Sequence, residues 1–200
     1  MKMSVKSRPK ESQSGLSLCM WNIHGMINNT RNYNKLDDSE FKMLVEGHDI
    51  IGLVETQISP DQPLALDQYY TYRMERTKSK NGRHFGGIAV FIKKHLRKDG
   101  IKIVAQTPDY IWLKLCRSFF GRVKDIYLCI VYIPPSNSEY LAKNSTDIIN
   151  KVQHDMVEYS KLGQTAMMGD LNARTGTELD FVINDDDNLP VDINYIIDGA

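Results

Sequence analysis

A carboxylate and a carboxamide stand two residues apart near the C-terminal end of the chain, in the segment AMMGDLNARTG, residues 166–176. Side chains at i and i+2 of an extended chain point to the same side, so Asp170 and Asn172 are expected to share a face, with Leu171 turned into the protein. A carboxylate at a strand end can orient or deprotonate a water molecule, and a carboxamide supplies donors without charge. A simple turn would explain the same residues, so the rest of the sequence has to distinguish the two interpretations.

Three further polar residues stand where apolar runs end. Asn22 ends the first run in MWNIHG, Glu55 ends another in GLVET, and Tyr132 lies near the end of IVYIPP. Each has an ordinary explanation alone, as a turn residue, a solvated carboxylate or a core tyrosine with a satisfied hydroxyl. Their shared position at strand ends instead predicts that they meet at one edge of the fold, together with the Asp170 segment.

The elements that would position these residues alternate along the chain. Apolar runs predict strands at residues 16–22, 49–55, 69–76, 86–93, 101–105, 110–116, 125–133 and 164–169. Helical spacing of apolar residues predicts helices over residues 37–46 and 146–161, the second capped by Ser145. Many strands with few helices between them favour packed sheets with outer helices over a regular βαβ array.

The composition is that of one globular domain of 200 residues with a formal net charge of zero, which argues against binding polyanions by bulk charge alone. Residues 73–102 are basic and residues from 170 onward are acidic, which would suit an anionic substrate and metal ions, or two solvated faces. Three separated cysteines predict reduced thiols in an intracellular protein. Residues 1–15 are predicted to be a disordered polar segment without a signal peptide, and no run is long enough to span a membrane.

The order WN, VET, VYIPP and GDLN resembles the endonuclease/exonuclease/phosphatase superfamily. The segments MWNIHG, IIGLVET, FGGIAVFIK, IVYIPPS and MMGDLNART look most like the endonuclease domain of non-LTR (LINE-type) retrotransposons, over residues 16–176. The resemblance implies an α/β fold of DNase I-like type, a four-layer sandwich of two mixed sheets with outer helices. It also implies metal-dependent hydrolysis of phosphodiester bonds in DNA.

The resemblance also implies roles for the strand-end residues. Glu55, assisted by Asn22, would hold Mg²⁺, with Mn²⁺ as a possible substitute, because hard cations take oxygen ligands. Asp170 would orient or deprotonate the attacking water, Asn172 would hold a phosphate oxygen and position Asp170, and Tyr132 would donate to the phosphate. For three further residues, contact with phosphate and a solvated role are equally favoured: Arg83, His84 and Arg174.

The chain departs from the family pattern at its C-terminal end. Members carry a closing Ser-Asp-His motif, whereas this sequence ends in INYIIDGA and all five histidines precede Asp170. We therefore expect residues 16–200 to form a truncated domain with an incomplete second sheet. His24, beside Asn22, occupies a variable family position, and a solvated or hydrogen-bonded loop histidine is the favoured interpretation.

Three functions follow as alternatives. The first is an endonuclease of apurinic or retrotransposon type acting on DNA, impaired in this fragment and nuclear if it acts on genomic DNA. The second is an inactive remnant that only binds nucleic acid or a partner, and the third is a phosphatase or phospholipase of the same superfamily. The remainder of a larger polyprotein with a reverse transcriptase is a possible partner, and no membrane partner is expected.

Overall fold

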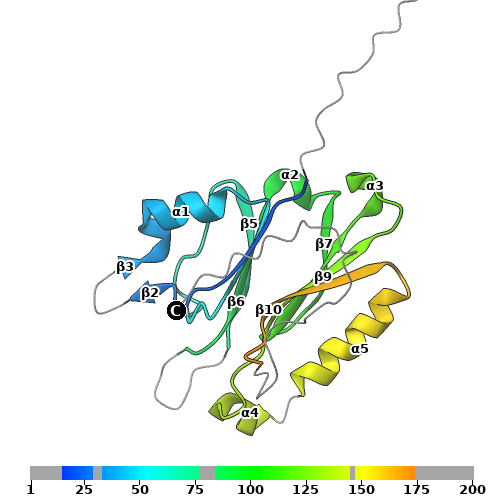
Figure 1. Ribbon diagram of the computed structural model, residues 1–200. Coiled ribbons are helices and arrows are strands. Elements are labelled where there is room, and N and C mark those ends of the chain that lie inside the picture. Colours follow the sequence, from blue (N-terminus) through cyan, green and yellow to red (C-terminus); the bar gives the residue numbers. More distant parts are fainter. Residues whose placement is uncertain (1–14, 29–32, 77–83, 145–146, 174–200) are drawn as a thin grey trace, which may run out of the picture.

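Two four-stranded sheets form the centre of the molecule in the computed structural model, which describes residues 15–28, 33–76, 84–144 and 147–173 (Figure 1). The first sheet has the order β1 (Leu18–Asn22), β4 (Ile50–Val54), β6 (Ile88–Lys93), β5 (Tyr69–Met74). The second has the order β10 (Gln164–Asp170), β9 (Ile126–Tyr132), β8 (Tyr110–Leu115), β7 (Ile101–Gln106). A small ribbon pairs β2 (Ile27–Asn28) with β3 (Tyr33–Asn34).

Helices lie outside the two sheets. The longest are α1 (Ser39–Glu46) and α5 (Ile148–Ser160), which flank the first and the second sheet respectively (Figure 1). The shorter ones are the 3-10 helix η1 (Lys35–Asp37), α2 (Lys94–Arg97), α3 (Arg117–Phe120) and α4 (Glu139–Asn144). No helix in the described residues combines the length and the apolar character that crossing a membrane requires.

The strands of the core are buried on both faces. In β8, Ile111 and Leu113 face the apolar layer between the sheets, whereas Trp112 faces the layer beneath α5. In β4, Ile50 belongs to the layer between the sheets and Leu53 to the layer beneath α1. Because neighbouring residues of a strand point to opposite faces, burial on both sides produces uninterrupted apolar runs. The helix–sheet–sheet–helix arrangement confirms the predicted four-layer sandwich.

The two parallel strand pairs align their carboxyl ends. In the first sheet β1 runs parallel to β4, with Asn22 opposite Val54, and in the second β10 runs parallel to β9, with Asp170 opposite Tyr132. The other pairs in the two sheets are antiparallel. The two strands of a parallel pair end at the same edge of a sheet. The residues at or just after the ends of β1, β4, β9 and β10 therefore lie at one edge of the sandwich.

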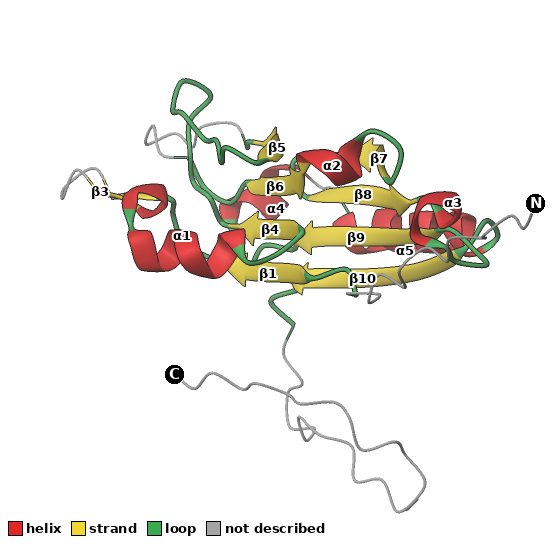
Figure 2. Ribbon diagram, turned by 90° about the horizontal axis from the view of Figure 1, so that it is seen from above, coloured by secondary structure: helices red, strands yellow, loops and turns green. Residues whose placement is uncertain are grey.

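The strands β1 and β10 border the sandwich on the same side (Figure 2). Among the described residues each has a hydrogen-bonded neighbour on one side only. Met167 in β10 is 40% exposed and Trp21 in β1 is 42% exposed, whereas the strand interiors of β4 and β9 are buried. This border therefore presents apolar side chains and free backbone groups.

Local capping explains where the helices differ from the sequence-based prediction. The region expected to be one helix from residue 37 is divided, because the Asp38 carboxylate accepts from the backbone N–H groups of Glu40 and Phe41 and starts α1 there. The cap of α5 is Asp147, which accepts from the Asn150 N–H at 2.9 Å. The prediction that Ser145 caps this helix was wrong, because α5 begins three residues after it. Ser145 itself lies outside the described residues.

Candidate active site at the carboxyl ends of the strands

Two side-chain hydrogen bonds join the two sheets at the edge where the parallel strands end. The Asn22 amide Nδ2 donates to Asp170 Oδ2 at 2.6 Å, across 148 residues of sequence. The Tyr132 hydroxyl donates to Glu55 Oε1 at 2.5 Å, across 77 residues. The structure thus brings four of the sequence-predicted site residues into one cluster, called the strand-end cluster below: Asn22, Glu55, Tyr132 and Asp170.

Glu55 occupies an unusual backbone position directly after β4, with φ 53°. Its side chain is 15% exposed, and its Oε2 atom lies 2.9 Å from Nδ1 of His24. Burial alone would raise the pKa of this carboxyl, but hydrogen bonds from Tyr132, His24 and Asn22 together hold the pKa below its usual range. Glu55 is therefore a carboxylate at neutral pH, held in place from three sides.

His24 is an exposed loop residue that contacts the site. Its side chain is 88% exposed, and its backbone N–H donates to Asn22 Oδ1 at 3.0 Å. The interpretation as a hydrogen-bonded loop histidine agrees with this position, and its partner Glu55 could not be read from the sequence.

Tyr132 remains a hydrogen-bond donor over the whole neutral range. Burial, followed by its hydrogen bond to Glu55 and the negative charge there, raises the pKa of the phenol well above its ordinary value. A phenol that keeps its proton can donate either to the Glu55 carboxylate or to an anionic ligand.

Asp170 and Asn172 form a turn rather than a continued strand. The backbone N–H of Asn172 donates to Asp170 Oδ1 at 2.9 Å, and Asn172 has φ 44°. The Asn172 amide Nδ2 donates to the Ile133 carbonyl at 2.8 Å, which fixes the turn to the end of β9. Leu171 is 37% exposed, so the expectation that it turns into the protein was wrong, because the chain leaves the extended conformation after Asp170. Asn172 is thus placed to position Asp170.

Gly169 explains why the apolar run stops where it does. Its φ is 153°, and a Cβ atom at this position would lie 1.9 Å from the Val131 carbonyl oxygen. Only glycine allows the β10 backbone to approach β9 this closely, one residue before Asp170.

Backbone strain in the described residues is concentrated at this edge. The non-glycine residues with positive φ there are His24, Glu55, Gln57 and Asn172, all in loops that leave β1, β4 and β10. Residues in such sparsely populated conformations cost about 1–3 kcal/mol each and gather at functional sites. The loops support one another, since the N–H of Gly25 donates to the Glu55 carbonyl at 2.6 Å.

A buried arginine behind Tyr132 was missed by the sequence analysis. Arg76 is 5% exposed, and its Nε and Nη2 atoms donate to Asp109 Oδ1 at 2.9 and 2.6 Å. Nη2 also donates to the Tyr132 carbonyl at 3.1 Å, and the guanidinium lies 4.7 Å from the centre of the Tyr132 ring and 4.2 Å from that of Tyr140. Arg76 therefore fixes both the backbone and the ring of Tyr132.

The remaining predicted phosphate contacts are not part of the cluster as described. Arg83 and Arg174 lie outside the described residues. His84 is half-buried, and its Nδ1 atom lies 3.3 Å from the Arg76 carbonyl oxygen, so it is placed against the backbone that leads to Arg76.

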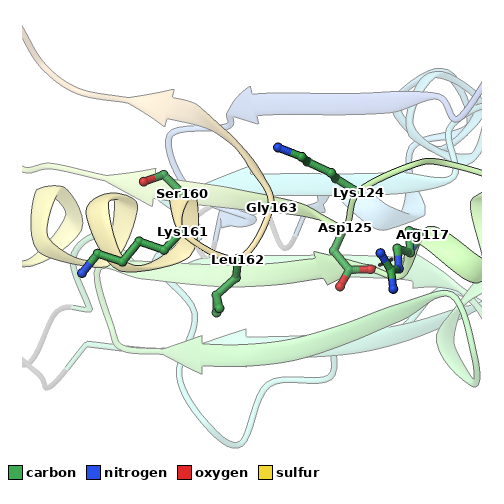
Figure 3. A pocket seen from close by; sticks show the side chains of 7 residues that line it. All are labelled: Arg117, Lys124, Asp125, Ser160, Lys161, Leu162 and Gly163. Atoms are coloured by element: carbon green, nitrogen blue, oxygen red, sulfur yellow. Dashed lines mark hydrogen bonds between the residues drawn. The ribbon is translucent and has the colours of Figure 1, made fainter.

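Hollows open at both ends of the sheets on the described part of the surface. One lies at the opposite, amino ends of β9 and β10 and is lined by Arg117, Lys124, Asp125 and residues 160–163 (Figure 3). Its carboxylate is already satisfied, because Asp125 accepts from the Arg117 N–H at 2.7 Å and pairs with Lys114 at 2.9 Å. The other hollow adjoins the strand-end cluster and includes Asn22 and His24 in its lining.

The donor set of the strand-end cluster suits a hard divalent cation. Glu55, Asp170 and Asn22 supply carboxylate and carboxamide oxygens, which are the ligands that such cations prefer. In the described part of the chain, no lysine or arginine forms an ion pair with Glu55 or Asp170, so their negative charge is available to a cation. The described residues contain no group of three or more His, Cys, Asp or Glu side chains arranged to hold a metal ion. A cation at the cluster would therefore complete its shell with water or substrate.

Solved structures of other proteins resemble the chain over part of their length. The solved structures that resemble the chain include the human Nocturnin catalytic domain with bound sulfate anion (15% identity, 80% of this chain, 64% of that chain, TM-score 0.49). They also include TDP2 from C. elegans (14%, 80% and 48%, TM-score 0.46) and truncated C. elegans TDP2 (14%, 80% and 63%, TM-score 0.43). The chain therefore spans about half to two thirds of the length of these solved chains. No curated protein sequence matches it.

The sequence profile of the endonuclease/exonuclease/phosphatase family matches residues 20–190. That range includes all four residues of the strand-end cluster. The chain belongs to the endonuclease/exonuclease/phosphatase family.

Proposed function

We propose that this protein hydrolyses phosphodiester bonds in DNA at the strand-end cluster, with Mg²⁺ as its cofactor and Mn²⁺ as a possible substitute. The observation that supports this most is the pair of hydrogen bonds that join the two sheets, Asn22 to Asp170 and Tyr132 to Glu55. They hold two carboxylates, neither of which pairs with a lysine or arginine among the described residues, beside a protonated phenol. Phosphoester hydrolysis needs groups of these kinds.

Each side chain has a distinct role in the proposed reaction. Asp170 accepts a proton from the attacking water, and the oxygen of that water forms a bond to phosphorus. The bond from phosphorus to the leaving sugar oxygen breaks, and this oxygen takes up a proton from solvent water. Asn22 and Asn172 hold Asp170 in orientation, and Tyr132 donates to a phosphate oxygen. Glu55 and Asn22 would hold the divalent cation, which supplies charge neutralisation at the phosphate.

DNA is favoured over other phosphoesters by the GDLNART context of Asp170 and by the basic stretch of residues 73–102. The GDLNART context is part of the resemblance to LINE-type retrotransposon endonucleases. An enzyme of that type would act on genomic DNA in the nucleus, beside a reverse transcriptase. A phosphatase or phospholipase of the same family would use the same cluster on a small or lipid phosphoester.

Nicking of supercoiled plasmid with Mg²⁺ tests the proposal. Mg²⁺-dependent nicking is expected, and Asp170→Ala should remove it, whereas Asp99→Asn, which changes an exposed carboxylate after α2, should not. Nicking that persists in Asp170→Ala would exclude this cluster as the site, and the absence of nicking with either Mg²⁺ or Mn²⁺ would contradict the proposed function.

A further inference from the structure

An exposed tryptophan stands beside the strand-end cluster. Trp21 precedes Asn22 in β1 and is 42% exposed, whereas Trp112, the other of the two tryptophans, is fully buried. The Trp21 ring stacks on Phe41 of α1, with ring centres 5.4 Å apart and an angle of 29° between the planes. The stacking on one side holds the indole in place while part of it stays open to solvent.

Trp21 is one wall of the hollow beside the cluster, called the aromatic groove below. The groove has a volume of about 340 Å³, and its lining includes Asn22, His24, Tyr33 and Phe41. Asn22 also belongs to the strand-end cluster, so a ligand bound at the cluster would lie next to the groove.

The charges around the aromatic groove disfavour a phosphate there. Asp38 and Glu40 line it, against the single ammonium of Lys35, which donates to the Ile23 carbonyl. The Asp38 carboxylate accepts from the Tyr33 hydroxyl at 2.7 Å and also caps α1. The Glu40 carboxylate beside the aromatic walls suits a flat, neutral ring that carries N–H donors.

We propose that the aromatic groove binds a nucleobase of the substrate, next to the nucleotide whose phosphate occupies the strand-end cluster. The base stacks on the open part of Trp21, and its N–H groups face the carboxylate of Glu40. The inference rests on the proposed nucleic-acid substrate and deepens it, because an inositol or lipid phosphate has no ring that stacks. Stacking of a base on an aromatic side chain contributes about ten-fold or more to affinity for a single strand.

The test is binding of a short single-stranded oligodeoxycytidylate in EDTA, compared with an abasic chain that carries the same number of phosphates. Fluorescence anisotropy of end-labelled strands gives the affinities, and intrinsic tryptophan emission reports contact with Trp21. The oligodeoxycytidylate should quench the emission and bind about ten-fold more tightly than the abasic chain. In Trp21→Leu this preference should disappear.

Two variants control for folding and for general surface effects. Trp21→Phe keeps an aromatic ring, so it should lose the quenching but retain most of the preference for bases. Phe119→Leu changes an aromatic side chain that is also 42% exposed but lies on α3, away from α1, and should leave the preference unchanged (Figure 1).

Equal binding of the two strands by the unaltered protein, or a preference that survives in Trp21→Leu, would overturn the base-binding role of the groove. Failure of the proposed function has a different signature, because hydrolysis is tested by Asp170→Ala and not by Trp21. A protein with the Trp21-dependent preference but without Asp170-dependent nicking would support base binding in the aromatic groove and contradict the proposed hydrolysis.

Discussion

The buried ion pair behind Tyr132 provides a sharp test of how the site is supported. Arg76→Met removes the guanidinium that gives Asp109 two hydrogen bonds, at 2.9 and 2.6 Å. Asp109 is 4% exposed and would keep only the Tyr140 hydroxyl, at 3.1 Å, among the side-chain bonds described for it. The variant therefore leaves a carboxylate buried without a cation.

The expected cost follows from that environment. Breaking a buried pair by removing one partner destabilises a protein by about 3–5 kcal/mol. Loss of the contacts with the Tyr132 and Tyr140 rings adds to this, at about 0.5–2 kcal/mol each. Domains of this kind are stable by about 5–15 kcal/mol, so Arg76→Met should remove a large part of the free energy of unfolding.

Urea unfolding followed by circular dichroism measures the change, and a double variant identifies its cause. Adding Asp109→Leu to Arg76→Met removes the unpaired charge, so the double variant should be clearly more stable than Arg76→Met alone. Lys161→Met serves as the control, because it breaks an exposed ion pair with Glu158. The Lys161 side chain is 61% exposed and that of Glu158 is 50% exposed, so the loss should be less than about 1 kcal/mol. A loss below about 1 kcal/mol in Arg76→Met, or additive losses in the double variant, would refute the reasoning.

Three other perturbations test the fold around the site. Gly169→Ala should lower the free energy of unfolding by about 1–3 kcal/mol or more, because the added Cβ would lie 1.9 Å from the Val131 carbonyl oxygen. Urea unfolding measures this loss, and an unchanged midpoint would contradict it. Burial alone would raise the pKa of Asp49, but hydrogen bonds from Ser17 and the Lys93 ammonium lower it. The ionised Asp49 side chain therefore contributes its full stabilisation above about pH 4, and this contribution is lost as the pH falls through the pKa of the folded state. Asp49→Asn should therefore cost the most stability at neutral pH and progressively less as the pH falls below about 4, and a cost that does not change with pH would count against the linkage. Finally, the border of β1 and β10 should make the purified protein self-associate or bind a hydrophobic dye. A monomer in sedimentation that binds no dye would exclude this.

The sandwich could be predicted because its strands are buried on both faces. IIGLV in β4 and IYLCIVY in β9 are almost fully buried, and such runs are visible as uninterrupted apolar sequence. The gathering of Asn22, Glu55 and Asp170 could be anticipated from their shared position at strand ends. Parallel pairing of β1 with β4 and of β10 with β9 provides the geometry that the expectation required.

The features that escaped prediction depend on contacts between distant or locally distorted residues. Arg76 and Asp109 are separated by 33 residues, and neither stands in a pattern that marks it as buried. The inward direction expected for Leu171 assumed an extended chain, which the turn at Asn172 ends. The helices α2 and α3 have four residues each, too few for a helical period to be visible in the sequence.

The central proposal is that the strand-end cluster binds a divalent cation through Glu55 and Asn22, and paramagnetic broadening by Mn²⁺ tests it directly. In an amide-resolved NMR titration, Mn²⁺ should broaden the signals of Asn22, Glu55 and Asp170 first. Glu55→Gln should require much more Mn²⁺ for the same effect, whereas Glu46→Gln, an α1 residue whose side chain is 38% exposed, should behave as the unaltered protein. Equal broadening in the unaltered protein and in Glu55→Gln would remove Glu55 from the metal site and contradict the proposed chemistry of the cluster.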